Sequence, residues 1–249
     1  MKKINTILAA VGALLMLSVT SANSLEFKAG VSANGMAAYA NAKETLKGTG
    51  AGTGRVTSEE AVLATSFASI FAEISSDEFM GLGIGVSYAP EVVDLNKETR
   101  EINTCTDGTR NAGDEVACVA KSGSSADSGT TTVDGKINDL VSLYVTMPVG
   151  DTGAYVKAGY IQATMVTEES LATGSKYEDV DMSGTQIGGG YEGSLGDMAF
   201  WRAEGSYQMW EDISAGGSES DNGSVDTTKN NISAEIGSIT GSLSIGMKF

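Results

Sequence analysis

The sequence predicts an all-β fold, an eight-stranded antiparallel up-and-down transmembrane β-barrel, and three observations support this prediction. Alternation with a period of two recurs along the chain, whereas the period of 3.6 that marks a sustained amphipathic helix does not. Short and long connections alternate between the predicted strands. The chain also ends on the segment SLSIGMKF, in which apolar side chains occupy every second position up to the last residue.

The first 24 residues have the pattern of a secretory signal. Two lysines precede an apolar core over residues 7–17, and small side chains allow cleavage before Leu25. A transmembrane helix needs about 20 apolar residues, so this core is too short to be one. We therefore expect residues 1–24 to be a signal peptide and residues 25–249 to be the barrel of an exported protein.

Eight segments alternate over a length sufficient to cross a bilayer obliquely, which takes about 9–11 residues. The predicted strands cover residues 25–40, 61–74, 79–90, 137–148, 154–166, 183–195, 198–210 and 232–249. The long connections are residues 41–60, 91–136, 167–182 and 211–231. In an antiparallel barrel this alternation places the long loops at one end and the short turns, with both termini, at the other. Transmembrane barrels have this arrangement, with periplasmic turns and extracellular loops.

Most predicted strands have one apolar and one polar face. Strand 198–210, for example, places Trp201 on one face and Arg202 on the other. The polar faces carry mainly Gly and Ser, unlike a face exposed to water, and a membrane barrel turns its apolar face to lipid. The aromatic residues near strand ends are Phe27, Trp201 and Phe249 at the turn end and Tyr39, Tyr88 and Tyr207 at the loop end. Segments 61–74 and 154–166 carry apolar groups on both faces, so their facing stays open.

With these features the sequence resembles the small outer-membrane β-barrels of Gram-negative bacteria, of the OmpX and OmpA-barrel type. The resemblance covers residues 25–249 and rests on the signal, the eight-strand alternation and the C-terminal Phe249. It implies an outer-membrane location in contact with lipid and lipopolysaccharide. In that family the apolar end of the last strand resembles the signal read by the barrel-insertion machinery. The residues that match it here are Leu243, Ile245, Met247 and Phe249.

An eight-stranded barrel has an interior just wide enough for side chains to fill, so charges inside it should be paired. The predicted inward charges are Glu26, Lys28, Glu73, Lys157, Glu192, Arg202, Glu204 and Lys248. Nearly all of them fall in the turn-side half of the barrel. We therefore predict an ion-pair plug, with Arg202 held between Glu192 and Glu204. Glu26 and Lys248, at the rim, have the alternative of facing periplasmic water.

The composition argues against several classes of function. The net charge of −16 should repel nucleic acid. The chain has no His, so a Ser–His–acid arrangement is not available. Outer-membrane lipases and barrel proteases, which this fold resembles, generally depend on a histidine. We expect no catalytic residues, no cofactor and no metal site.

Cys105 and Cys118 are the only cysteines. In an exported protein, an even pair this close in sequence is most simply a disulfide, with two free thiols as the alternative. The predicted loops 91–136, 167–182 and 211–231 carry an excess of acidic residues. They suit divalent-cation bridging to lipopolysaccharide, or contact with an extracellular ligand, a cell or a phage. The alternative interpretation is a solvated surface kept soluble by its charge.

Three functions remain open on the sequence alone. The first is a structural or surface-interaction role, in which a lipid-embedded scaffold displays acidic loops outside the cell. The second is a small-solute or ion channel of the porin class. The third is a soluble periplasmic β-protein that binds an apolar ligand. The direction in which the apolar face points separates the third function from the first two.

Overall fold

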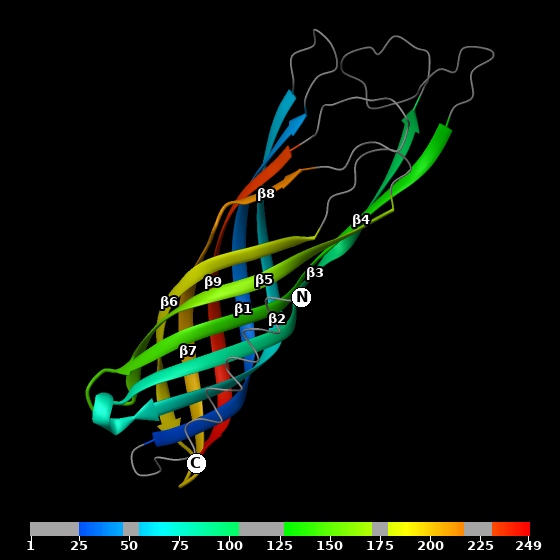
Figure 1. Cartoon of the computed structure of the whole chain (residues 1–249). Coiled ribbons are helices and arrows are strands. Elements are labelled where there is room, and N and C mark those ends of the chain that lie inside the picture. The colour runs from blue at the N-terminus through cyan, green and yellow to red at the C-terminus, as the bar shows by residue number, and fades with distance from the viewer. Residues whose placement is uncertain (1–24, 47–54, 105–126, 171–178, 217–230) are drawn as a thin grey trace, which may run out of the picture.

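The computed structural model describes residues 25–46, 55–104, 127–170, 179–216 and 231–249, which form one closed antiparallel barrel (Figure 1). Its strands are β1 (Leu25–Leu46), β2 (Arg55–Ser76), β3 (Leu82–Thr104), β4 (Asp127–Pro148), β5 (Ala154–Ser170), β6 (Val180–Ser194), β7 (Ala199–Trp210), β8 (Ile213–Gly216) and β9 (Asn231–Lys248). Strand β1 pairs with β9 and closes the wall. The short β8 pairs with β9 beyond the end of β7, so eight strands make the wall and the predicted fold class is confirmed.

The last residue belongs to this closure. The backbone N–H of Phe249 donates to the carbonyl of Phe27 at 2.9 Å, and the N–H of Phe27 donates to the carbonyl of Phe249 at 3.2 Å. The chain is therefore ordered up to its C-terminus, as the terminal alternation predicts. No helix in the described part of the chain has the length and apolar character that crossing a bilayer requires.

The register around the wall fixes the tilt of the strands. A circuit of paired residues that leaves β1 at Ala29 returns to β1 at Tyr39, a shift of ten residues. The circuit passes through Ala72, Val86, Leu143, Tyr160, Thr185, Met209 and Gly237. For eight strands this shift corresponds to a tilt of about 40°, which is ordinary for closed barrels. The interior of such a barrel is filled by side chains.

The apolar faces point outward. On β9, Leu243 is 67 % exposed and Ile245 is 61 % exposed, whereas Ser244 between them is buried. On β7, Trp201 is exposed and Arg202 is buried. The structure also assigns the facing of segments 61–74 and 154–166, which the sequence leaves open. In the barrel-forming parts of β2 and β5 the odd-numbered residues point into the lumen.

The exterior apolar band has the height of a bilayer core. On β9 it runs from Ile239 to Phe249, and at the tilt above this length of strand spans about 25 Å along the barrel axis. That is the height of the apolar band of transmembrane barrels, about 25 Å. Toward the loop end the same faces become polar, with exposed carboxylates at Glu235, Asp181 and Glu211.

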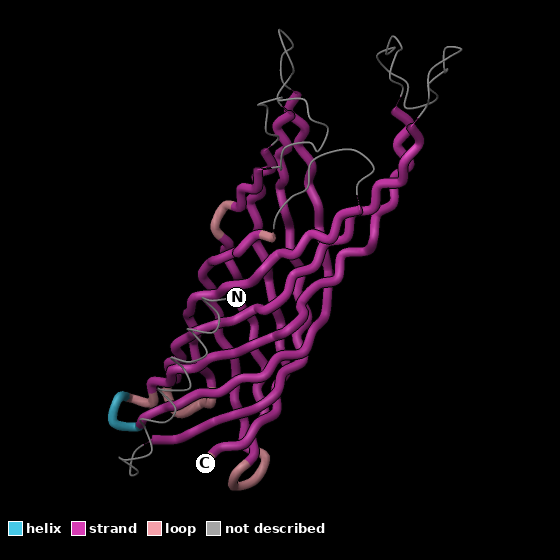
Figure 2. The backbone as a smooth tube through the Cα atoms, turned by 45° about the vertical axis from the view of Figure 1, so that its right-hand side comes forward, coloured by secondary structure: helices cyan, strands magenta, loops and turns pink. Residues whose placement is uncertain are grey.

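The strands are longer at the loop end than the sequence predicts. Strand β1 extends to Leu46 and β2 begins at Arg55, so much of the predicted loop 41–60 is sheet. In the same way β3 extends to Thr104 and β4 begins at Asp127, within the predicted loop 91–136. Figure 2 shows these strands projecting beyond the barrel. In these upper stretches, such as residues 91–104, the sequence lacks the strict alternation of apolar and polar residues that marks the lower strands, so alternation does not predict them.

Two other boundaries of the predicted strands are wrong. The third strand starts at Leu82 rather than residue 79, because Asp77–Phe79 forms a 3-10 turn and Met80 and Gly81 have φ values of 58° and 74°. The predicted loop 211–231 also contains β8. Hydrophobic alternation encodes neither the turn geometry at residues 77–81 nor a strand of only four residues.

The wall has one short ladder. Strands β2 and β3 pair only from Ser76↔Leu82 to Ile70↔Tyr88, whereas β1 and β2 pair along their full length. Beyond that point two side chains bond to the backbone instead. Thr65 Oγ1 donates to the carbonyl of Val92 at 3.0 Å, and Asn34 Nδ2 donates to the carbonyl of Phe67 at 3.2 Å.

We expect this seam, residues 65–69 of β2 facing residues 89–92 of β3, to exchange its amide hydrogens faster than the rest of the wall. Exchange requires local opening, and few backbone hydrogen bonds hold the seam closed. Hydrogen exchange followed by mass spectrometry in micelles would measure it, with residues 33–37 of β1 as the control because they pair on both sides. Equal protection of the two segments would contradict the expectation.

Candidate functional site

The turn-side half of the lumen holds an ion-pair network centred on Arg202 of β7. Its guanidinium donates to both carboxylate oxygens of Glu73 on β2, at 2.9 and 2.7 Å. Its Nε donates to Glu192 of β6 at 2.7 Å. Arg202 is 5 % exposed and Glu73 is 2 % exposed, so this bidentate pair is buried. It crosses the lumen, because β2 and β7 are not neighbours in the wall.

Two further cations complete the network. Lys28 of β1 lies 2.9 Å from Glu192 and 3.1 Å from Glu26. Lys157 of β5 lies 2.6 Å from Glu204 of β7, and the hydroxyl of Tyr155 donates to the other oxygen of Glu204 at 2.9 Å. These residues alternate with outward apolar residues on their strands, which is why they face inward together.

Four buried aromatic side chains surround these charges, and we call them the aromatic collar. They are Phe71, Tyr144, Tyr155 and Phe200. The guanidinium carbon of Arg202 lies 5.2–5.3 Å from the ring centres of Phe71, Tyr155 and Phe200. Lys157 Nζ lies 4.1 Å from the ring centre of Tyr144. Such cation–π contacts stabilise a cation that has left water.

Each collar ring lies over a glycine of another strand. A Cβ at these glycines would collide with the ring, and the glycines are Gly30 under Phe71, Gly85 under Tyr144, Gly190 under Tyr155 and Gly246 under Phe200. The sequence analysis did not identify the collar. Inward glycines at the level of large inward aromatics are the signal that points to it.

The structure brings together most of the predicted site residues. Arg202 contacts Glu192 as predicted, but its other partner is Glu73, and Glu204 pairs with Lys157 instead. The tilt of the strands explains the difference, because it brings β2 to the level of Arg202 from across the lumen. The Glu26 side chain, 42 % exposed, lies at the rim, and Lys248 is at the same end with its backbone N–H bonded to Met198.

Other predicted features lie elsewhere. Leu243, Ile245, Met247 and Phe249 are all on the exterior. Cys105 and Cys118 lie outside the described residues, as do residues 1–24.

The lumen on the loop side of the collar holds a polar layer and then an apolar cluster. In the polar layer Ser32 and Ser244 are hydrogen-bonded at 2.7 Å, and Gln186 donates to Ser142. The buried members of the apolar cluster are Met36, Ala89, Val92, Val93, Leu140, Ile161 and Ala163. The sequence predicts a polar inner face on most strands and leaves the facing of segments 61–74 and 154–166 open, because both of their faces carry apolar groups. Two of the cluster's members, Ile161 and Ala163, come from segment 154–166, which has apolar residues on both faces, and Leu63 and Phe67 of segment 61–74 pack against the cluster.

The carboxylates of the network are all engaged by cations. The four carboxylates of the network, Glu26, Glu73, Glu192 and Glu204, each contact a cation. In the described ranges no group of three or more Asp, Glu, His or Cys is placed to hold a metal ion. Carboxylates held by cations in this way suit a structural plug.

Removing the Tyr155 hydroxyl should weaken the network measurably. We expect Tyr155→Phe to lower the free energy of unfolding by about 1.5–3 kcal/mol, because Glu204 loses a hydrogen bond to a charged acceptor while the ring stays in the collar. Urea unfolding in micelles would measure it. The matched control is Tyr191→Phe, whose ring is 46 % exposed on the exterior and packs beside Trp201. Equal losses in both variants would contradict this role.

A closed antiparallel wall, an exterior apolar band of bilayer height and a paired polar lumen define a β-barrel of the outer-membrane type. No family model matches the chain, and neither does any curated protein. Solved structures similar to it include the outer membrane protein OprG from Pseudomonas aeruginosa, with 12% identity and a TM-score of 0.44 over 91% of this chain and 96% of that one. Ail, the attachment invasion locus protein of Yersinia pestis, has 11% identity and a TM-score of 0.39 over 90% and 99%. The outer membrane protease OmpT from Escherichia coli has 11% identity and a TM-score of 0.43 over 92% and 100%.

Proposed function

We propose that this protein is a closed outer-membrane scaffold that displays acidic loops at the cell surface and has no enzymatic activity. The observation that supports it most is the crossing of the lumen by Arg202 and Glu73, which are both almost completely buried. A barrel built for diffusion would keep a water-filled interior. Here the charged network within its aromatic collar, the polar layer and the apolar cluster occupy successive levels of the lumen.

Export and insertion complete the proposal. Residues 1–24 act as the signal peptide, and the end of β9 with Phe249 serves as the segment that the barrel-insertion machinery reads. The exposed apolar series on β9 supports this role, because its side chains are accessible along one face up to the last residue. Lipid and lipopolysaccharide surround the band.

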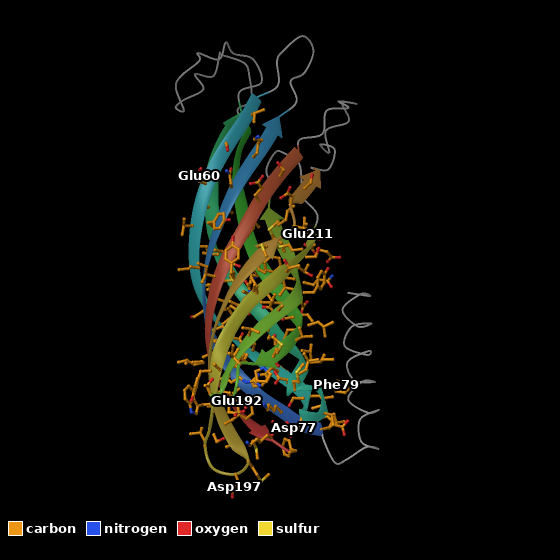
Figure 3. The ribbon with its side chains drawn as sticks, turned by 90° about the vertical axis from the view of Figure 1, so that its left-hand side faces the viewer. Glu60, Asp77, Phe79, Glu192, Asp197 and Glu211 are labelled. Atoms are coloured by element: carbon orange, nitrogen blue, oxygen red, sulfur yellow. The ribbon has the colours of Figure 1, made fainter. Side chains whose placement is uncertain are left out.

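The loop end supports a surface role through its charge. Exposed acidic side chains from several strands gather there, among them Glu60 and Glu211 (Figure 3). The segment 105–126 holds Cys105 and Cys118, and a disulfide between them would tie it into a compact loop. We propose that these acidic segments bridge to lipopolysaccharide through divalent cations or contact a basic partner, such as an extracellular ligand, a cell or a phage.

The absence of activity is proposed on two grounds. The chain has no His to act as a general base. The lumen carboxylates contact Lys or Arg, and an acid–base dyad would need at least one of them to exchange protons with a substrate.

Planar-bilayer recording tests the proposal against the porin-class alternative. The purified full-length mature chain should give no large, stable conductance, and the double variant Arg202→Met with Glu204→Gln should raise conductance by removing charges that hold the network. A large, stable conductance of the unaltered protein would overturn the scaffold. Protease added to intact cells should cut within residues 105–126, and complete resistance that persists after reduction would overturn surface display.

A further inference from the structure

The tight turns at the end of the barrel opposite the long loops expose apolar side chains. Met80 is 83 % exposed, Phe79 is 67 % exposed and Leu195 is 55 % exposed. Val149 and Met198 are exposed in the same way, and we call these five residues the turn ring. They come from three separate hairpins, β2–β3, β4–β5 and β6–β7.

The turn ring is held in rigid turns. The N–H of Met80 donates to Asp77 at 3.2 Å, that of Val149 to Ala154 at 2.8 Å, and that of Leu195 to Ala199 at 2.7 Å, each through a backbone carbonyl. Gly150 and Gly196 supply the positive φ that two of the turns need. The apolar side chains therefore have fixed positions, so a single surface can receive all of them.

Met80 is unfavourable for a turn in water on two counts. Its φ of 58° lies in the left-handed region, which costs conformational energy for a residue other than glycine, and Asn or Gly usually fills such a position. Its side chain is also the most exposed of the ring. A strained residue that presents an apolar side chain indicates a contact at that place.

The ring continues the exterior apolar band. Phe249, which is 69 % exposed, and Met247 end the band on β9 at the same end of the barrel, and Leu82 on β3 follows Met80 and Gly81 directly. Each turn also carries exposed acidic groups, including Asp151 in the turn between β4 and β5. Asp77 and Asp197 lie in the other two turns (Figure 3). The tips are therefore amphipathic.

The geometry points to a phospholipid surface as the partner of the turn ring: its apolar side chains lie in the headgroup layer of the periplasmic leaflet and set the depth of the barrel. Lipid contacts the mouth from all sides, as a ring from three hairpins requires, whereas a protein partner would favour a patch on one side. The acidic groups remain in water. This inference rests on the proposed outer-membrane location.

Site-directed spin labelling tests it. Met80, Val149 and Leu195 are replaced one at a time by Cys in a Cys105→Ser, Cys118→Ser background, labelled with a nitroxide, and folded into phosphatidylethanolamine–phosphatidylglycerol vesicles. Collision with oxygen reports apolar surroundings, and collision with a water-soluble nickel chelate reports water. Asp151→Cys in the same turn as Val149 is the control for water, and Leu243→Cys is the control for the band.

Nickel accessibility at the three ring positions should be several-fold lower than at Asp151, and higher than at Leu243. Ring values equal to that at Asp151, with Leu243 protected, would overturn the inference and leave the membrane location standing. Exposure of Leu243 to nickel would overturn the location itself. If the cysteine-free background does not fold, the variant Phe79→Trp with Trp201→Phe and Trp210→Phe places a single tryptophan in the turn ring. Brominated lipid should quench its fluorescence, and unquenched fluorescence would contradict insertion of the ring.

Discussion

Replacing Arg202 by methionine is expected to lower the free energy of unfolding by about 3–5 kcal/mol, because it leaves buried carboxylates without their cation. Glu73 is 2 % exposed and accepts two hydrogen bonds from Arg202, so in the variant its buried carboxylate loses both of these bonds and its ion-pair partner. Glu192 keeps Lys28 at 2.9 Å and is affected less. Reversible urea unfolding in micelles, followed by tryptophan fluorescence, would measure the loss.

A double variant separates the loss of a partner from the loss of packing. Arg202→Met with Glu73→Gln removes both charges of the buried pair, and it should recover a substantial part of the stability that Arg202→Met loses. Lys43→Met, at an exposed position on β1, is the control for a change in net charge. A loss with Arg202→Met no larger than with Lys43→Met would show that the network does not hold the lumen together.

Replacing Leu243 by arginine is expected to destabilise the barrel in a bilayer by about 2–4 kcal/mol, the cost of a cation on the lipid face near the bilayer midplane. Leu243 is 67 % exposed and lies within the apolar run of β9, so lipid is what its side chain would contact. Unfolding of the variant from phosphatidylcholine vesicles would measure the effect.

The control lies on the exterior of β2 beyond the band. Val62 is 85 % exposed, so Val62→Arg changes the same kind of residue where water replaces lipid. Its effect should be about 0–1 kcal/mol. Equal losses of stability with Leu243→Arg and Val62→Arg would show that Leu243 does not lie near the bilayer midplane.

The facing of most barrel residues can be predicted from the sequence, because lipid accepts apolar side chains and the lumen accepts polar ones. On β7 and β9 this contrast predicts Arg202 inside and Leu243 outside, and Arg202 is 5 % exposed whereas Leu243 is 67 % exposed. The pairing of β1 with β9 closes the wall, so neither strand is left as an exposed edge. Where the alternation fades, so does the prediction: residues 91–104 belong to strand β3, yet their sequence has no strict alternation of apolar and polar residues.

The site shows the same division. Alternation places Arg202 in the lumen and leaves the facing of the segment that carries Glu73 open. The pairing of Glu73 with Arg202 depends on a shift of ten residues around the wall, which no single strand encodes. The aromatic collar depends on inward glycines of other strands, such as Gly85 under Tyr144. Both features arise from the closed circuit, so they require the register of every ladder at once.

Labelling from the lipid phase tests most directly whether the apolar faces meet hydrocarbon. A lipid-soluble carbene precursor would be photolysed in vesicles that contain the folded chain, and labelled positions would be mapped by mass spectrometry. On β4 the label should fall on Leu143, Val145 and Met147 and avoid Ser142, Tyr144 and Thr146, which are buried in the lumen. Labelling of the second set in place of the first, or no label on either, would mean that the chain does not face lipid with this surface.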